Sequence, residues 1–184
     1  MNKTEYFIFT GAMGAGKTTV LNELKSCGFL CINEPARIIL KEQRSAGGRG
    51  VPETDPELFN ELMLEKMIGD FNENLNSGEP VLFDRGIPDV IAYAELLGTD
   101  ALKSKIASEK YIYNRTVFAF NAWKEIYTND EERKMSFNLA EKFGINVKKI
   151  YKDSGYEIID VPFLPLKERA DFIKNIIIEI YKAK

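Results

Sequence analysis

The sequence contains no histidine and has only two cysteines and one tryptophan among its 184 residues. Without histidine, acid–base chemistry near neutral pH falls to carboxylates, lysine, cysteine, tyrosine or water, and a Ser-His-Asp or Cys-His device is excluded. The cysteines, Cys27 and Cys31, lack the CxxC spacing of a zinc site, and we expect two buried, reduced thiols in a cytoplasmic protein. We interpret the tryptophan, Trp123, as core packing rather than as a base-stacking platform.

Long apolar runs and an excess of one charge are missing as well. The longest apolar stretches, such as residues 6–9 and 176–178, fall far below the ~18 residues needed to span a bilayer. Residues 1–5 lack the features of a secretory signal. The 28 acidic and 25 basic residues leave a net charge of -3, with no basic stripe to neutralise a nucleic-acid backbone. We therefore expect neither a membrane nor a nucleic-acid polymer as a partner.

What is present predicts a single α/β domain over residues 1–184. Short apolar segments alternate with helical ones, and this order is typical of a three-layer α/β/α sandwich around a five-stranded parallel sheet. The expected strands are residues 6–10, 29–33, 81–84, 116–120 and 156–161. The expected helices are residues 17–27, 35–44, 56–75, 88–97, a short stretch before Thr116, residues 130–153 with a break at Gly144, and residues 166–182.

The strongest motif is GAMGAGKT at residues 11–18, which matches GxxxxGK[ST] and lies between an expected strand and an expected helix. In such a P-loop the backbone amides and the helix N-terminus bind phosphate groups. Lys17 is then expected to contact the β- and γ-phosphates, and the Thr18 hydroxyl to hold Mg²⁺. The motif predicts a site for Mg-ATP formed by Gly11, Ala12, Met13, Gly14, Ala15, Gly16, Lys17, Thr18 and Thr19.

Two acidic residues follow strands that are expected to end beside the P-loop. Asp84, in VLFDRG, is a candidate magnesium ligand, directly or through water, and Arg85 is a candidate phosphate ligand. The alternative for this pair is a turn with a surface ion pair. Glu34, in CINEPAR, is a candidate base for an acceptor hydroxyl, or else an acid that the helix dipole favours. Arg37, one helical turn further on, is a candidate substrate ligand.

Further arginines belong to two segments that we expect to be mobile. Residues 45–56 carry three glycines and two prolines, and Arg44 and Arg49 at this loop are candidate acceptor ligands or merely exposed side chains. Residues 127–145 form a candidate lid, in which Arg133 is a candidate for stabilising transition-state charge. A solvated helical face is the alternative for the lid segment.

These motifs resemble the P-loop kinase superfamily, and within it the small ATPases of the AAA_28 type, which are related to the kinase domain of NadR-like proteins. The resemblance extends over nearly the whole chain, through FIFTGAMGAGKTTVLNELKSCGF, INEPARIIL, FDRGIPDVIAYAELLG, IYTNDEERKMSF and GYEIIDVPFLPLKERADFI. The EP and DR pairs also resemble deoxynucleoside kinases, which implies that Glu34 is the base and Arg85 the phosphate ligand. Gly86 stands where that family has a small hydroxyl residue.

The residues leave three functions open. The first is an ATP- and Mg-dependent phosphotransferase acting on a small, nucleoside- or nucleotide-like acceptor held between residues 45–56 and the lid. The second is an ATP hydrolase or nucleotide-dependent switch without such an acceptor, and the third is a module that senses ATP. A GTPase is disfavoured because no NKxD segment follows the fourth expected strand. The length leaves no room for the extra helical domain that an oligomeric AAA machine needs. We expect a monomer or homodimer.

Overall fold

The sheet at the centre of the molecule is five-stranded, entirely parallel and ordered β2-β3-β1-β4-β5. The computed structural model describes residues 1–73, 78–127 and 135–182. All residues of β1, β3 and β4 are buried, which is why these segments form continuous apolar runs instead of alternating ones. The strands are β1 Tyr6–Gly11, β2 Leu30–Ile32, β3 Val81–Asp84, β4 Thr116–Phe120 and β5 Glu157–Asp160.

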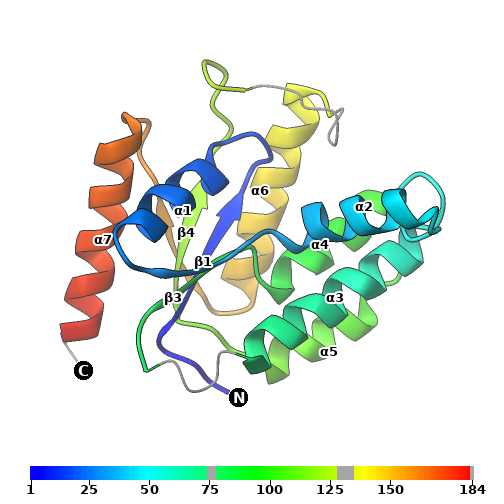
Figure 1. Ribbon diagram of the computed structural model, residues 1–184, viewed down its shortest axis with the longest axis horizontal. Coiled ribbons are helices and arrows are strands. Elements are labelled where there is room, and N and C mark those ends of the chain that lie inside the picture. The colour runs from blue at the N-terminus through cyan, green and yellow to red at the C-terminus, as the bar shows by residue number, and fades with distance from the viewer. Residues whose placement is uncertain (74–77, 128–134, 183–184) are drawn as a thin grey trace.

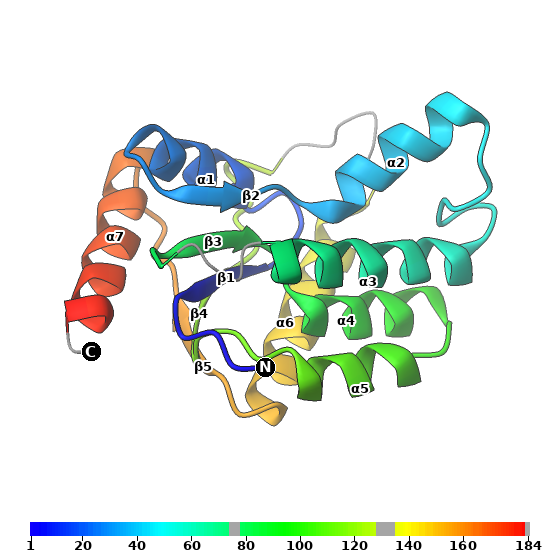
Figure 2. The same ribbon diagram turned by 60° about the horizontal axis from the view of Figure 1, so that its bottom comes forward.

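Helices cover both faces of this sheet (Figures 1 and 2). The helices are α1 Lys17–Ser26, α2 Pro35–Ala46, α3 Pro56–Glu73, α4 Ile87–Leu97, α5 Leu102–Lys110, α6 Phe137–Asp153 and α7 Leu166–Lys182. Helices α1 and α7 pack side by side on one face, whereas α3, α4 and α6 cover the other, with α2 against α3 and α5 against α4. The three-layer α/β arrangement predicted from the sequence is confirmed.

Alternate side chains of β1 divide the interior into two cores. Phe7 and Phe9 pack with the inner faces of α1 and α7. Tyr6 and Ile8 point to the opposite side and pack with α3, α4 and α6. Because β1 is the middle strand, the loop that follows it leaves the sheet between the two helical layers, and this position places the glycine motif at the carboxyl edge of the sheet.

Helix α6 runs without interruption through Gly144, so the expected break is wrong. The glycine is required for space. A Cβ on Gly144 would lie 3.0 Å from the backbone nitrogen and from the Cβ of Ala12, which is tighter than nine in ten real Cβ contacts. A side chain here would therefore force α6 or the start of the P-loop to shift by a few tenths of an ångström. Residues 137–145, part of the expected lid, form the first turns of this packed helix.

The two cysteines differ in their exposure. Cys31 is buried but Cys27 is exposed, because Cys27 caps the outer end of α1, so the expectation of two buried thiols is wrong for Cys27. Burial raises the pKa of the Cys31 thiol to about 11. Within the three described ranges, no helix is long and apolar enough to cross a bilayer.

Candidate nucleotide-binding site

The glycine motif folds into a loop that is anchored on the neighbouring strand. Gly11, Gly14 and Gly16 have φ angles of 110°, 71° and 82°, which L side chains rarely adopt. A Cβ on Gly11 would lie 2.3 Å from the carbonyl oxygen of Phe120, and the same oxygen accepts a hydrogen bond of 2.8 Å from the amide of Ala12. The end of β4 therefore fixes the first residues of the loop, and the glycines shape the rest.

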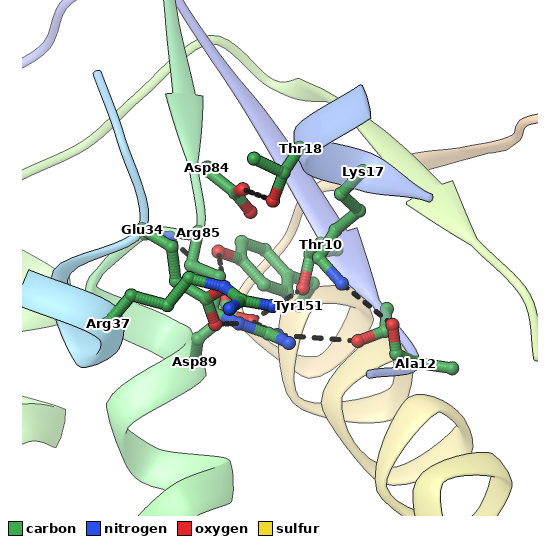
Figure 3. A network of polar contacts seen from close by, with 12 residues as sticks. Thr10, Ala12, Lys17, Thr18, Glu34, Arg37, Asp84, Arg85, Asp89 and Tyr151 are labelled. Carbon is green, nitrogen blue, oxygen red and sulfur yellow. Dashed lines mark hydrogen bonds and ion pairs between the residues drawn. The ribbon is translucent and has the colours of Figure 1, made fainter. Parts of the chain in front are cut away.

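Lys17 lies across the loop, with its Nζ donating a hydrogen bond of 2.7 Å to the carbonyl of Ala12 (Figure 3). The loop borders a cleft of about 300 Å³. The cleft is lined by Gly14, Ala15, Gly16, Lys17, Thr18, Thr19, Glu34, Arg37, Ile126 and Arg169. Gly11, Ala12 and Met13 are buried and do not line it. The cleft is thus lined by the second half of the P-loop, by Glu34 and Arg37 at the start of α2, and by Arg169 of α7.

Thr18 and Asp84 form a pair that fits Mg²⁺. The Thr18 hydroxyl donates a hydrogen bond of 2.7 Å to Oδ2 of Asp84, and Oδ1 of Asp84 is buried without a hydrogen-bond partner (Figure 3). Burial and then the charge of Glu34 raise the pKa of Asp84. A hydroxyl and an incompletely compensated carboxylate suit a hard divalent cation, which takes its remaining ligands from phosphates and water. Among the described residues no cluster of three acidic or cysteine side chains could hold a metal alone.

Glu34 is held at the edge of the cleft by two arginines. The residue is 2% exposed and stands directly before α2. Its Oε1 accepts a hydrogen bond of 2.9 Å from Nε of Arg85, and its Oε2 lies 3.5 Å from Nε of Arg37. The carboxylate makes no capping hydrogen bond to α2. Guanidinium groups, rather than the amides of the helix start, therefore set its orientation.

Arg85 is 1% exposed, so the surface ion pair that the sequence left open is wrong. Its Nη1 donates a hydrogen bond of 2.7 Å to Oδ1 of Asp89, and its guanidinium lies 5.5 Å and 5.3 Å from the ring centres of Tyr93 and Phe143. Although burial opposes the charge, Tyr93, Glu34 and Asp89 raise the pKa of Arg85 well above its usual value. Nη2 is buried without a hydrogen-bond partner. Contact with phosphate stays a prediction, whereas the contact with Glu34 is present.

Sequence reasoning missed Asp89, which organises this buried network. Asp89 is fully buried and accepts hydrogen bonds from the hydroxyls of Thr10 at 2.8 Å and Tyr151 at 2.7 Å, from the amide of Gly86 at 3.1 Å, and from Arg85 (Figure 3). Burial and then Asp89 raise the pKa of Tyr151 well above its usual value, so the phenol remains a donor. The available signal was the spacing in DRGIPD, because residues four apart can pair at a helix start.

Gly86 departs from the deoxynucleoside kinase pattern for a reason of space. A Cβ on Gly86 would lie 2.7 Å from Cδ1 of Ile8 and 2.9 Å from the hydroxyl oxygen of Tyr151. The hydroxyl of Tyr151, from α6, therefore occupies the position beside Gly86 into which a small hydroxyl side chain would project. An added side chain at residue 86 would displace it.

Arg44 and Arg49 do not line the cleft. Nη2 of Arg44 lies 2.8 Å from Oε1 of Glu53, and Nη2 of Arg49 lies 3.1 Å from Oδ2 of Asp55, both in the connection between α2 and α3. Their role in binding an acceptor stays a prediction. Arg133 lies outside the described residues, as does much of the expected lid.

A parallel sheet with a glycine loop after its central strand, and a carboxylate from the next strand bonded to the loop's threonine, defines a P-loop nucleotide-binding protein. The model of the AAA_28 family, described as an AAA domain, matches residues 6–169. The chain therefore belongs to the AAA_28 family, and the resemblance stated from its motifs is confirmed.

The fold is shared with a kinase of known structure. Deoxyadenosine kinase from M. mycoides, solved with its products dCMP and a flexible dCDP bound, superposes with a TM-score of 0.68 at 18% sequence identity. The match covers 95% of this chain and 99% of the kinase. At this identity the likeness establishes the fold alone. No curated protein sequence matches the chain.

Proposed function

We propose that this protein is an ATP- and Mg²⁺-dependent phosphotransferase that transfers the γ-phosphoryl group of ATP to a hydroxyl of a small, nucleoside- or nucleotide-like acceptor. The observation that carries the proposal is the position of Glu34, a buried carboxylate that lines the same cleft as the P-loop and is held by Arg85 and Arg37. A carboxylate fixed beside bound phosphates suits the deprotonation of an acceptor hydroxyl. The fold shared with a deoxyadenosine kinase supports an acceptor of the nucleoside kind.

Each residue of the site has its own role in the proposed reaction. The loop amides and Lys17 bind the β- and γ-phosphates. Thr18 and Asp84 would hold Mg²⁺, which would stabilise charge on the phosphate oxygens. The acceptor oxygen attacks the γ-phosphorus, the bond to the β–γ bridging oxygen breaks, and ADP leaves with the electron pair. Glu34 accepts the proton of the acceptor hydroxyl while Arg85 keeps the carboxylate in position.

Hydrolysis of ATP without an organic acceptor is the second candidate, and one observation favours it. Arg44 and Arg49, the arginines expected to contact an acceptor, are paired with Glu53 and Asp55 instead. If these ion pairs persist with nucleotide bound, water takes the place of the acceptor.

Product analysis distinguishes the two candidates. The protein is incubated with Mg²⁺ and ATP radiolabelled on the γ-phosphate, with and without a panel of nucleosides and nucleotides, and the products are separated. We expect the label to move to an organic acceptor. Release of all label as inorganic phosphate, at a rate that no acceptor changes, would sink the phosphotransferase and favour the hydrolase.

Two substitutions assign the roles of the residues. Glu34→Gln keeps an oxygen for Arg85 but removes the base, so we expect ATP binding to persist and turnover to fall by about 10²- to 10⁴-fold. Lys17→Ala removes the cation of the P-loop and is expected to abolish ATP binding in calorimetry without unfolding the protein. Full turnover by Glu34→Gln would reduce Glu34 to a structural carboxylate, and unchanged affinity of Lys17→Ala would contradict the site itself.

A further inference from the structure

Two arginines are buried in the described part of the chain, and they differ in how their charge is compensated. Arg85 is paired with the carboxylates of Glu34 and Asp89. Arg169, in the first turn of α7, is 6% exposed and forms no ion pair with any described residue. A buried cation without a carboxylate is costly, because desolvation of the charge is not offset by an opposite charge. Such a group is stable only where something else compensates it.

The contacts of Arg169 compensate it incompletely. Its Nη1 lies 3.5 Å from the carbonyl oxygen of Ala15, at the outer limit of a hydrogen bond. Its Nε is buried without a hydrogen-bond partner. The guanidinium carbon lies 5.2 Å from the ring centre of Trp123, a cation–π contact that supplies part of the missing stabilisation. Burial lowers the pKa of Arg169, as expected for a guanidinium short of partners.

The position of Arg169 relates this unpaired charge to the P-loop. A Cβ on Gly16 would lie 2.9 Å from Nη1, and the arginine lines the cleft together with the loop. Arg169 follows β5 whereas Glu34 follows β2, and these strands are the two opposite edges of the sheet. Arg169 therefore reaches the loop from the side opposite the proposed base, where phosphate groups that are not transferred would lie.

We propose that Arg169 is a nucleotide-binding residue, whose guanidinium exchanges the carbonyl of Ala15 for an oxygen of the non-transferred phosphates, and that Trp123 holds it in place until the nucleotide arrives. The inference rests on the proposed function, since it needs a nucleotide in the cleft. It concerns affinity rather than chemistry, because the arginine lies away from the base and the metal ligands. The bound anion completes the coordination that the guanidinium lacks.

Trp123 gives this inference a direct readout. The ring is half-buried, lies outside both main cores and stacks on the exposed ring of Phe163 at 5.1 Å, so the interpretation as core packing is wrong for Trp123. Phe118 and Phe120, its neighbours in sequence, do belong to the core. Because the chain has a single tryptophan, its fluorescence reports on the guanidinium that covers this ring.

The first experiment titrates the wild-type protein, in the presence of Mg²⁺, with ATP, inorganic tripolyphosphate and adenosine while tryptophan fluorescence is recorded. We expect a saturable change with ATP and with tripolyphosphate, because both draw the guanidinium from the ring, and no change with adenosine. A response to adenosine with none to tripolyphosphate would overturn the proposal and make Trp123 a platform for the base.

The second experiment compares Arg169→Met with Arg115→Met. Arg115 is a matched control, because it also stacks on a ring, that of Tyr156 at 5.7 Å, and donates to the carbonyl of Gly155 at 3.1 Å, but stands at the amino edge of β4. We expect Arg169→Met to raise the calorimetric Kd of ATP by about 10- to 100-fold, with kcat at saturating ATP within a few-fold of wild type. The Kd of ATP for Arg169→Lys should fall between the values for wild type and Arg169→Met. The Kd for Arg115→Met should match that of wild type.

The stability of the proteins without nucleotide separates a binding role from a structural one. Since Arg169 is an incompletely compensated buried cation, Arg169→Met should be at least as resistant to urea as wild type. A less stable Arg169→Met with ATP affinity within about twofold of wild type would overturn the proposal. If the wild-type protein itself binds no ATP in calorimetry, the proposed function fails and this inference with it, which is a different result from equal binding by wild type and variant.

Discussion

Asp84 carries a charge that the folded chain compensates only in part. Burial, and then the nearby charge of Glu34, raise the pKa of this carboxyl, although Lys17, Arg85 and the Thr18 hydroxyl act in the opposite direction. A carboxyl with a raised pKa in the folded state binds protons more tightly there than in the unfolded chain, so it lowers stability as the pH rises through and above its unfolded value of about 4. The proposed metal ligand therefore lowers the stability of the metal-free protein.

We predict that Asp84→Asn makes the metal-free protein more stable at pH 7.5, because the amide carries no charge to desolvate. The difference should shrink as the pH is lowered, and it should be smallest below about 3, where the carboxyl is protonated in both folded and unfolded states. Urea unfolding without Mg²⁺ and nucleotide measures both effects. The same substitution should lower Mg²⁺-dependent turnover by at least about 10- to 100-fold.

Asp171→Asn is the control for this substitution, because Asp171 is exposed on α7 and lies away from the cleft. It should leave turnover unchanged. A loss of stability in Asp84→Asn at pH 7.5 would mean that the hydrogen bond from Thr18 outweighs the burial of the carboxylate.

The sequence identified those site residues that a contiguous pattern marks and missed those that only the fold assembles. Lys17 and Thr18 follow from the motif alone. Asp89 needed the knowledge that Tyr151, far along the chain, would donate to it. Arg85 also has a φ angle of 78°, the one positive value outside glycine in the described residues. A strained backbone of this kind is kept by contacts around it and has no sequence signature.

At the scale of elements, the packing of α6 against the P-loop depends on the lack of a side chain at Gly144. Intrinsic propensity makes alanine better than glycine inside a helix by about 1 kcal/mol. At Gly144 the added Cβ would meet the backbone of Ala12 at 3.0 Å, so either α6 or the P-loop has to move. We predict that Gly144→Ala lowers the free energy of unfolding by about 1–3 kcal/mol and weakens ATP binding, as measured by urea unfolding and calorimetry.

Gly69 provides the matched control, since it lies inside α3 and an added Cβ there would meet nothing within 4 Å. Gly69→Ala should raise the free energy of unfolding by up to about 1 kcal/mol and leave ATP binding unchanged. Stabilisation by both substitutions would show that the close approach of α6 to the loop does not limit packing.

Elements were predictable where local signals and packing agree. Continuous apolar runs located β1, β3 and β4, and Pro35 and Pro56 marked the starts of α2 and α3. The expected break in α6 shows the opposite case, because a glycine that weakens a helix locally can be the residue that lets the helix pack. Propensity measures the isolated segment, whereas the contact with Ala12 is made between segments distant in sequence.

At the scale of the whole molecule, bound nucleotide should stabilise the fold by mass action. Free Mg-ATP at about 100 times its Kd adds about 2.7 kcal/mol, and each kcal/mol raises the Tm of a chain of this length by about 2–4 °C. We therefore predict a rise in Tm of about 5–10 °C, measured by calorimetric scanning.

Removal of the metal is part of the same measurement. EDTA should abolish most of the rise in Tm, because Thr18 and Asp84 then have no cation to share with the phosphates. Lys17→Ala should show no rise under either condition. An equal rise with and without EDTA would contradict a metal at the Thr18–Asp84 pair.

The overall architecture was predictable because alternation of strands and helices admits few topologies. Because all strands are parallel, Glu34, Lys17, Asp84 and Arg169 then lie at the carboxyl ends of the strands. What an acceptor would contact depends instead on side chains at the connection between α2 and α3. Arg49 lies within this connection and Arg44 in the last turn of α2, and their partners in this structure, Asp55 and Glu53, belong to the connection. Connections carry weaker sequence signals than buried strands do.

The anchoring of the P-loop on Phe120 has a consequence for how the protein is made. A ribosome completes the glycine motif before β4, and the carbonyl that fixes the amide of Ala12 belongs to a residue more than a hundred positions later. Parallel strands joined by long crossovers also pair slowly. While the residues between these two positions are synthesised, the nascent chain therefore carries a finished phosphate-binding motif that has no fixed shape. Cellular ATP can assist its folding only after β4 has emerged from the exit tunnel.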